Sequence, residues 1–148
     1  MLLFHLEGTF SSELPIKIRS EDKSEAAPFV LRNARLEADP MGATTRLRSV
    51  LTIANIDATR RITEIEWRLD VYDESLHTLS VRVLQEDKLN IYSNETASAS
   101  ARFGAVLPDR MVILLQLVRV SYADGSAWAP PVPCELEEDL RTVLCKSK

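Results

Sequence analysis

Two histidines, two cysteines and a few closely spaced acids are the residues of this chain best suited to chemistry. His5 lies among the first residues and His77 follows a turn signal, and no other ligand-type residue is spaced to join either histidine. A protein metal site needs convergent His, Cys or carboxylate ligands at recognisable intervals. The sequence therefore predicts no metal site and no other cofactor.

The hydroxyl and carboxyl groups also lack the setting that catalysis needs. No Gly-x-Ser-x-Gly elbow occurs, and only four glycines are available for phosphate-binding loops. Carboxylate pairs could be assembled from Asp70 and Asp73, or from Glu64 and Glu66. Acids on one strand face ordinarily pair with arginine on the next strand. We therefore predict that the chain is not an enzyme, and an enzyme of unfamiliar type is the weakest hypothesis.

Both cysteines, Cys134 and Cys145, lie in the C-terminal tail. A disulfide between them would close only a short loop, and two separate thiols are the alternative. A single pair at this spacing is not a zinc motif, which needs four ligands.

Length and charge limit the partners. A chain of 148 residues is the size of one ordinary domain. A net charge of −4 without a basic run argues against nucleic acid, which needs clustered Lys and Arg. No stretch reaches the ~20 apolar residues of a membrane span. The first residues lack the basic leader of a signal peptide, so we expect a protein partner or self-association, in a compartment that the sequence leaves open.

Alternation with a period of two dominates the chain and predicts β-strands. The clearest strand runs from Ile65 to Tyr72, with Trp67 on its apolar face and predicted to lie in the core. The segment from Phe29 to Ala38 alternates with a slip near Asn33, which predicts a bulge.

Glycine and proline mark the turns between these strands. Asp39-Pro40-Met41-Gly42 predicts one turn. Asp124-Gly125 predicts a hairpin in which both central residues adopt positive φ. Trp128 opens the short return strand, and Pro130-Pro131 ends it.

At least seven short strands with turns between them predict an all-β fold: an immunoglobulin-like antiparallel β-sandwich. We place this domain at residues 28–132. Residues 1–27 form a strand-like N-terminal arm, and residues 133–148 form a C-terminal tail. The tail is predicted to be a short helix, with strand as the second choice, because apolar residues recur at helical spacing and acids precede the terminal lysine. These apolar residues are Leu136, Leu140, Val143 and Leu144.

One strand end carries a family-like motif. Leu69-Asp70-Val71-Tyr72-Asp73 resembles the signature of the FxLYD family, immunoglobulin-like bacterial domains with Phe-x-Leu-Tyr-Asp at the end of a central strand. The stretch from Val118 to Trp128 is similar to the final hairpin of such domains. The resemblance covers about residues 29–128, and Ser93-Asn94-Glu95-Thr96 departs from the Pro-Gly-Glu-like turn of the family. It implies a sandwich without catalytic residues and an extracytoplasmic location in the bacterial cell envelope.

Tyr72 and Asp73 are the best candidates for architectural roles at this strand end. The Asp73 carboxylate could cap the following turn by accepting backbone N–H bonds. The Tyr72 hydroxyl could bond across the sandwich, as in a tyrosine corner.

Two hypotheses therefore lead. The first is a non-catalytic structural or interaction module. The second is a homo-oligomer or filament in which the N-terminal arm is donated as a strand to a neighbouring copy. We prefer that the arm folds back on its own domain as an extra edge hairpin. The apolar residues of this arm that alternate like strands are Leu2, Phe4, Leu6, Leu14, Ile16 and Ile18.

Overall fold

The chain folds into twelve strands and no helix over the residues that the computed structural model describes. The described residues are 2–7, 10–14, 17–20, 27–41, 44–73, 75, 77–105, 110–130, 134–136 and 142–145. Side chains are described for 27–37, 47–73, 75, 77–103 and 110–130. No helix in these parts of the chain has the length and apolar character to cross a membrane.

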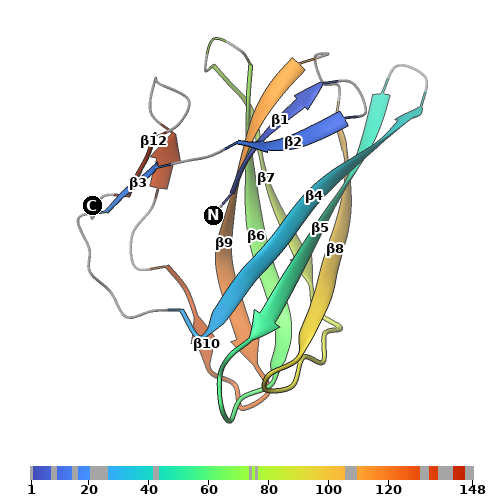
Figure 1. Cartoon of the computed structure of the whole chain (residues 1–148). Coiled ribbons are helices and arrows are strands. Elements are labelled where there is room, and N and C mark those ends of the chain that lie inside the picture. The colour runs from blue at the N-terminus through green and yellow to red at the C-terminus, as the bar shows by residue number, and fades with distance from the viewer. Residues whose placement is uncertain are drawn as a thin grey trace.

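Two sheets pack face to face as a β-sandwich, which confirms the predicted all-β class (Figure 1). Sheet I has the order β2-β1-β9-β6-β7, and β10 also pairs with β9. Its strands are β2 (Phe10–Leu14), β1 (Leu2–Glu7), β9 (Arg110–Tyr122), β6 (Ile62–Tyr72), β7 (Thr78–Glu86) and β10 (Ala127–Trp128). Sheet II consists of β4 (Phe29–Met41), β5 (Thr44–Asn55) and β8 (Thr96–Ala105), in that order. All pairings within both sheets are antiparallel.

The chain passes between the sheets several times. The β4–β5 hairpin lies in sheet II, the β6–β7 hairpin lies in sheet I, β8 returns to sheet II, and β9 pairs beside β6 in sheet I. Each crossing brings strands that are distant in sequence into one core.

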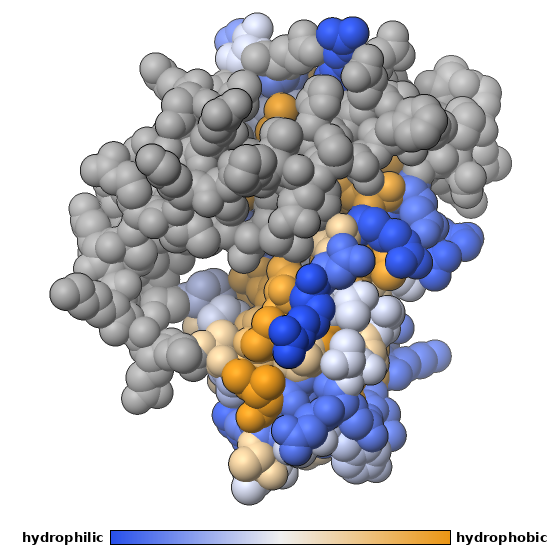
Figure 2. Space-filling view, in the orientation of Figure 1, coloured by the Kyte–Doolittle hydropathy of each residue, from blue (hydrophilic) through white to orange (hydrophobic). Residues whose placement is uncertain are grey.

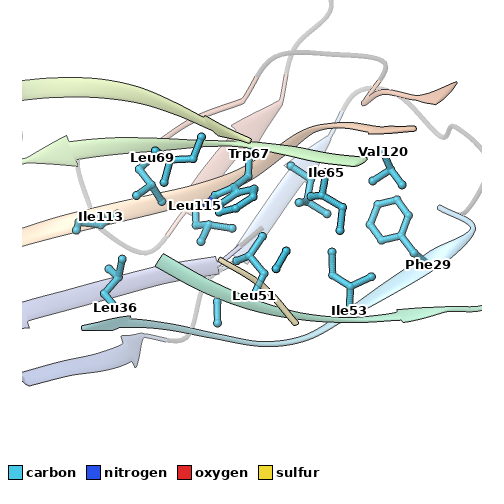
Figure 3. Close-up of a cluster of buried hydrophobic side chains, with 14 of the residues drawn as sticks. Phe29, Leu36, Leu51, Ile53, Ile65, Trp67, Leu69, Ile113, Leu115 and Val120 are labelled. Carbon is cyan, nitrogen blue, oxygen red and sulfur yellow. The ribbon is translucent and has the colours of Figure 1, made fainter. Parts of the chain in front are cut away.

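The core lies between the sheets and is centred on Trp67 (Figure 3). The Trp67 side chain is fully buried, and its Nε1 donates a hydrogen bond to Ser49 Oγ on β5 at 3.0 Å. Leu51 and Ile53 of β5 approach Ile65 of β6 across the interior (Figure 3). The alternation of β6 thus gives a strand with one face in the core, and a polar pair in that core is satisfied.

The turns differ in part from the prediction. The bulge near Asn33 is confirmed, because the β4–β5 register shifts between Leu31 and Asn33. The turn predicted at Asp39-Pro40-Met41-Gly42 is wrong for its first three residues, which continue β4 and pair with Thr44 to Arg46. Pro40 is tolerated there because β4 is an edge strand of sheet II, where a missing N–H need not leave a ladder bond unmade.

The hairpin after β9 also differs in detail. Only Gly125 has positive φ, at 88°, so the prediction of positive φ at Asp124 is wrong. Gly125 N–H donates to Tyr122 O and Tyr122 N–H donates to Ser126 O, which makes a three-residue loop. Such a loop needs one left-handed residue after a type I turn, and glycine takes that place without steric cost.

A small third sheet, sheet III, joins the two ends of the chain beside the sandwich (Figure 1). In it β12 (Thr142–Cys145) lies between β11 (Cys134–Leu136) and β3 (Lys17–Ser20), antiparallel to β11 and parallel to β3. The helix predicted for the tail is therefore wrong over 134–136 and 142–145. An isolated helix of about twelve residues is marginal in water, whereas a strand here gains the ladder bonds of β3.

Candidate interaction site

The two edges of β9 are paired very differently. β6 pairs with one edge along most of its length. On the other edge, β1 pairs with Arg110 to Leu115 and β10 pairs with Val120 and Ser121. No described strand pairs with residues 117–119 on that side. We call residues 117–119 the β9 gap, which lies between strands from distant parts of the sequence (Figure 1).

Proline explains why β10 does not cover the gap. β10 ends at Trp128, and Pro130 and Pro131 follow after one residue. Proline has no backbone N–H and cannot donate to the ladder of a neighbouring strand. Among the described residues, the pairing along this edge therefore stops after Trp128 and resumes where Leu2 of β1 pairs with Leu115.

An apolar groove of about 390 Å³ opens beside the β9 gap. Its walls come from the start of β4, from β9 and from the residues around β10. The Phe29 and Trp128 rings form one wall in an edge-to-face contact, with centroids 4.8 Å apart. We call this cavity the β9 groove. Its lining residues are Ala27, Phe29, Val30, Leu31, Gln116, Leu117, Trp128 and Pro130.

The groove reaches the edge of β9 as well as the core side of it. Gln116 and Leu117 are consecutive strand residues, so their side chains point to opposite faces of sheet I, yet both line the groove. On the face of the molecule in Figure 2, apolar residues are exposed in the lower half beside a hydrophilic band. A ligand in the groove could thus contact apolar side chains and strand backbone together.

A polar cluster on the outer face of sheet I fixes Gln116, the residue of β9 that precedes the gap. Gln116 Nε2 donates to Asp70 Oδ2 at 3.1 Å. Arg68 pairs with the same carboxylate, with Nε 2.9 Å from Oδ1 and a terminal nitrogen 3.0 Å from Oδ2. The Asp70 side chain is only 6% exposed. Its carboxylate is therefore held by Arg68 of its own strand and by Gln116 of the neighbouring strand β9.

The other acids considered for chemistry are placed apart from Asp70. Asp73 Oδ1 accepts hydrogen bonds from the backbone N–H groups of Ser75 and His77, and Oδ2 lies 3.3 Å from His77 Nδ1. The backbone bond from His77 is the largest cause of a lowered Asp73 pKa. Tyr72 is half-buried at the end of β6. The structure thus gives Asp73 a turn-capping geometry.

Glu64 and Glu66 lie on β6 opposite Ser121 and Arg119 of β9. Both acids are half-buried. Among the described residues, no group of three or more His, Cys, Asp or Glu side chains could hold a metal ion.

A hydrogen-bonded loop platform closes the end of the sandwich next to β10. Asn55 Nδ2 donates to the backbone oxygens of Arg60 and Ile91 at 2.8 and 2.9 Å. Asp57 Oδ1 accepts from the N–H groups of Thr59 and Arg60. The loop between β5 and β6 is therefore tied both to itself and to the segment before β8.

Arg60 connects this platform to the β9–β10 hairpin. Its guanidinium pairs with Asp57 Oδ2 at 2.7 Å, donates to Ser126 Oγ at 3.1 Å and lies 4.0 Å from the centre of the Tyr122 ring. The hydrogen bond from the Arg60 side chain is the main reason that the Asp57 pKa lies well below its usual value of 3.8. In the hairpin, Asp124 Oδ1 accepts from Ser126 N–H at 2.8 Å. This platform was not predicted from the sequence, although Asn55 and Asp57, residues with high turn propensity, follow one another closely there.

The apolar residues of the N-terminal arm fall on separate strands. Leu2, Phe4 and Leu6 belong to β1, where they pair with Leu115, Ile113 and Met111 of the same chain. Leu14 lies in β2, and Ile18 lies in β3 of sheet III. Ile16 lies outside the described residues. The first part of the arm thus extends sheet I of its own chain as an edge hairpin.

The two cysteines are brought opposite each other. Cys134 of β11 pairs in register with Cys145 of β12. Directly opposite residues of antiparallel strands have Cα atoms about 4.5–5.5 Å apart, within the range that a disulfide spans.

A second exposed apolar surface lies on β7. Leu79, Val81 and Val83 are 44, 52 and 57% exposed and alternate along one face of the strand. Val81 lies opposite Asp70, which places this set on the outer face of sheet I.

No protein-family model matches the chain, and no curated protein matches it.

Proposed function

We propose that this chain is a non-catalytic β-sandwich interaction module that binds a protein partner by strand addition at the β9 gap. The observation that carries the proposal is the coincidence of an interrupted strand edge with an apolar groove. Unpaired backbone groups on a strand edge are a template for another strand, and neighbouring pockets select its side chains.

The composition of the groove supports binding rather than catalysis. Seven of its eight lining residues are apolar, and the eighth, Gln116, is engaged with Asp70. Apolar burial and backbone hydrogen bonds are the interactions that such a site offers to a ligand. The loop platform and the Phe29–Trp128 contact hold the walls in place before a partner arrives.

The order of the strands supports the finer assignment to an immunoglobulin-like fold. The third strand of the sandwich, β6, pairs with β9 and carries the buried Trp67, while β4, β5 and β8 form the opposite sheet. A buried tryptophan on the third strand is a hallmark of that fold. We also propose a location in the bacterial cell envelope. The support for this location is the resemblance of residues 69–73 to the signature of the FxLYD family.

Tryptophan fluorescence can test strand addition directly. Trp67 is fully buried and Trp128 is half-buried at the groove, and the chain has no other tryptophan. A peptide of alternating valine and serine should change the emission of Trp128, and Trp128→Phe should abolish the change. The same peptide with proline at alternate positions should give no change, because it cannot donate ladder bonds. Equal responses to both peptides, or none to either, would contradict strand addition.

The register of β1 favours a second candidate, a homo-oligomer assembled by strand donation. β1 pairs with β9 over six residues, and β2, β3 and residues 21–26 separate it in sequence from β4. An edge hairpin on a long connection can pair with a neighbouring copy instead of its own chain.

Light scattering on the full chain and on a chain that starts at Pro28 tests this candidate. A multimeric full chain with a monomeric truncated chain would support donation. Stable monomers in both cases would exclude it.

A further inference from the structure

The only two cysteines of the chain occupy one register position of sheet III. β11 and β12 pair through three residues of each strand, and one of these pairs joins Cys134 to Cys145. Directly opposite residues of antiparallel strands share a face of the sheet, and their Cα atoms lie within the roughly 4.4–6.8 Å that a disulfide spans. The backbone therefore places the two thiol-bearing residues where one bond can join them.

The strand pairing that holds sheet III is short. β11 has three residues, and β12 and β3 have four residues each. The pairing of β12 with β3 is parallel and joins segments more than a hundred residues apart in sequence. Short ladders are marginal in water, parallel pairs are slightly less stable than antiparallel ones, and closure of a long loop costs chain entropy. A covalent bond within sheet III would offset these costs.

The position of β11 gives such a bond a long reach. Only residues 129–133 separate β11 from β10, which pairs with β9 in sheet I. A bond from Cys134 to Cys145 fixes β12 to a strand that follows closely on the sandwich. The other edge of β12 pairs with β3, the last strand of the N-terminal arm. The bond thus acts on both ends of the chain, although the loop that it closes is short.

We propose that Cys134 and Cys145 form a disulfide that fastens the N-terminal arm to the C-terminal tail. The oxidant is a second disulfide, which reacts by thiol–disulfide exchange. The thiolate of one cysteine displaces one sulfur of the oxidant, and the thiolate of the other cysteine then displaces the second sulfur. The protein loses two hydrogens and gains one S–S bond, and the oxidant leaves as two thiols. This site is independent of strand addition at the β9 gap.

Mass spectrometry of the full chain detects the bond. The reduced protein is equilibrated with a mixture of oxidised and reduced glutathione and is then alkylated in denaturant. In an oxidising mixture, neither cysteine should be alkylated. Arg141 is the only basic residue between the two cysteines, so trypsin cuts the chain there. The two peptides on either side of this cut should stay joined until a reductant is added.

Amide hydrogen exchange shows whether the bond fastens the two ends. Reduction should make the amides of residues 17–20 exchange at least about tenfold faster, because β12 is no longer bonded to β11. The amides of residues 65–72 in β6 should change by less than about twofold. The variant with both Cys134→Ser and Cys145→Ser is the matched control. It should exchange at the reduced rate whether or not a reductant is present.

Several results would overturn the inference. Alkylation of both cysteines in an oxidising mixture, or attachment of glutathione to each, would mean that the two residues do not bond to each other. A disulfide between two molecules would assign the cysteines to an intermolecular contact. A disulfide within the chain whose reduction leaves residues 17–20 unchanged would mean that it closes only the tail loop. None of these results would alter the peptide test of the β9 gap.

Discussion

The edge of β7 and the β9 gap both present strand backbone of sheet I without a described partner, and the two places are built differently. At β7, Arg82 lies opposite the core residue Leu69, so it occupies a core-facing position of the edge strand, and it is exposed. Glu86 of β7 accepts a hydrogen bond from Ser100 N–H on β8, which closes the seam between the sheets. Beside the β9 gap lies an apolar groove, and none of its lining residues is charged.

This difference shows which edge is protected. A charged side chain that points inward at an edge strand opposes pairing with another sheet, because pairing would bury the charge. β7 has this protection and the β9 gap has none. Both places offer strand backbone, but the inward charge opposes the pairing of another strand at β7, and no such charge opposes it at the β9 gap.

The largest expected effect comes from the residue that lies between the two places. Trp67 pairs with Leu84 of β7 on one side and with Leu117 of β9 on the other. Trp67→Ala should lower the free energy of unfolding by about 3–5 kcal/mol, because it empties the centre of the core. Urea denaturation measures this loss. Trp128→Ala is the control at the half-buried groove wall, and an equal loss there would contradict the central role of Trp67.

On the outer face of sheet I, the polar cluster beside β9 should contribute more to stability than the exposed apolar residues of β7. Asp70→Ala leaves the Gln116 amide and the Arg68 guanidinium without their carboxylate, and it should cost about 1–3 kcal/mol. Val81→Ala, at the exposed position opposite Asp70, should cost less than about 0.5 kcal/mol. Thermal or urea unfolding compares the two variants. Similar losses would mean that Asp70 does not anchor Gln116, the residue that precedes the β9 gap.

Removal of the inward charge should allow the β7 edges of two molecules to associate. Arg82→Val should leave the free energy of unfolding within about 0.5 kcal/mol and introduce self-association that depends on concentration. Sedimentation velocity detects the association. Arg102→Val removes an exposed arginine from β8 and serves as the matched control. If Arg82→Val associates no more than this control, charge protection is not what distinguishes the two places.

The smallest expected effect is the pH dependence of the loop platform. The folded pKa of Asp57 is lowered, chiefly by its hydrogen bond from Arg60, so its stabilisation is present above about pH 3.8 and is lost as pH falls through the folded pKa. Asp73 and Asp124 are lowered too and act with the same sign. The melting temperature of Asp57→Asn should therefore lie below that of the unchanged protein at pH 7, and the difference should shrink near pH 2. A difference that grows on acidification would contradict the assignment.

The sequence predicted the sandwich because strand alternation is a local signal. Ile65 to Tyr72 showed its core face directly, and the slip at Asn33 marked a real bulge. The tail was predicted wrongly, because its strands depend on β3, more than a hundred residues earlier in the chain. Local periodicity carries no information about such a partner.

The interaction site was harder to predict for the same reason. Pro130 and Pro131 indicated the end of a strand. The consequence appears only in the fold, where the described pairings of β1 and β10 with β9 leave residues 117–119 between them. Phe29 and Trp128 are about a hundred residues apart and meet only in the fold. The sequence placed each of them in a predicted strand, and the groove between them is a product of tertiary structure.

Amide hydrogen exchange along β9 tests the central claim most directly. In the free protein, those amides of residues 117–119 that face away from β6 should exchange faster than the corresponding amides of residues 110–115, which β1 covers. Addition of the valine–serine peptide should slow the amides of the gap and leave unchanged the amides of β7 that face away from β6. Equal protection along all of β9 before the peptide is added, or no added protection at saturating peptide, would contradict the account.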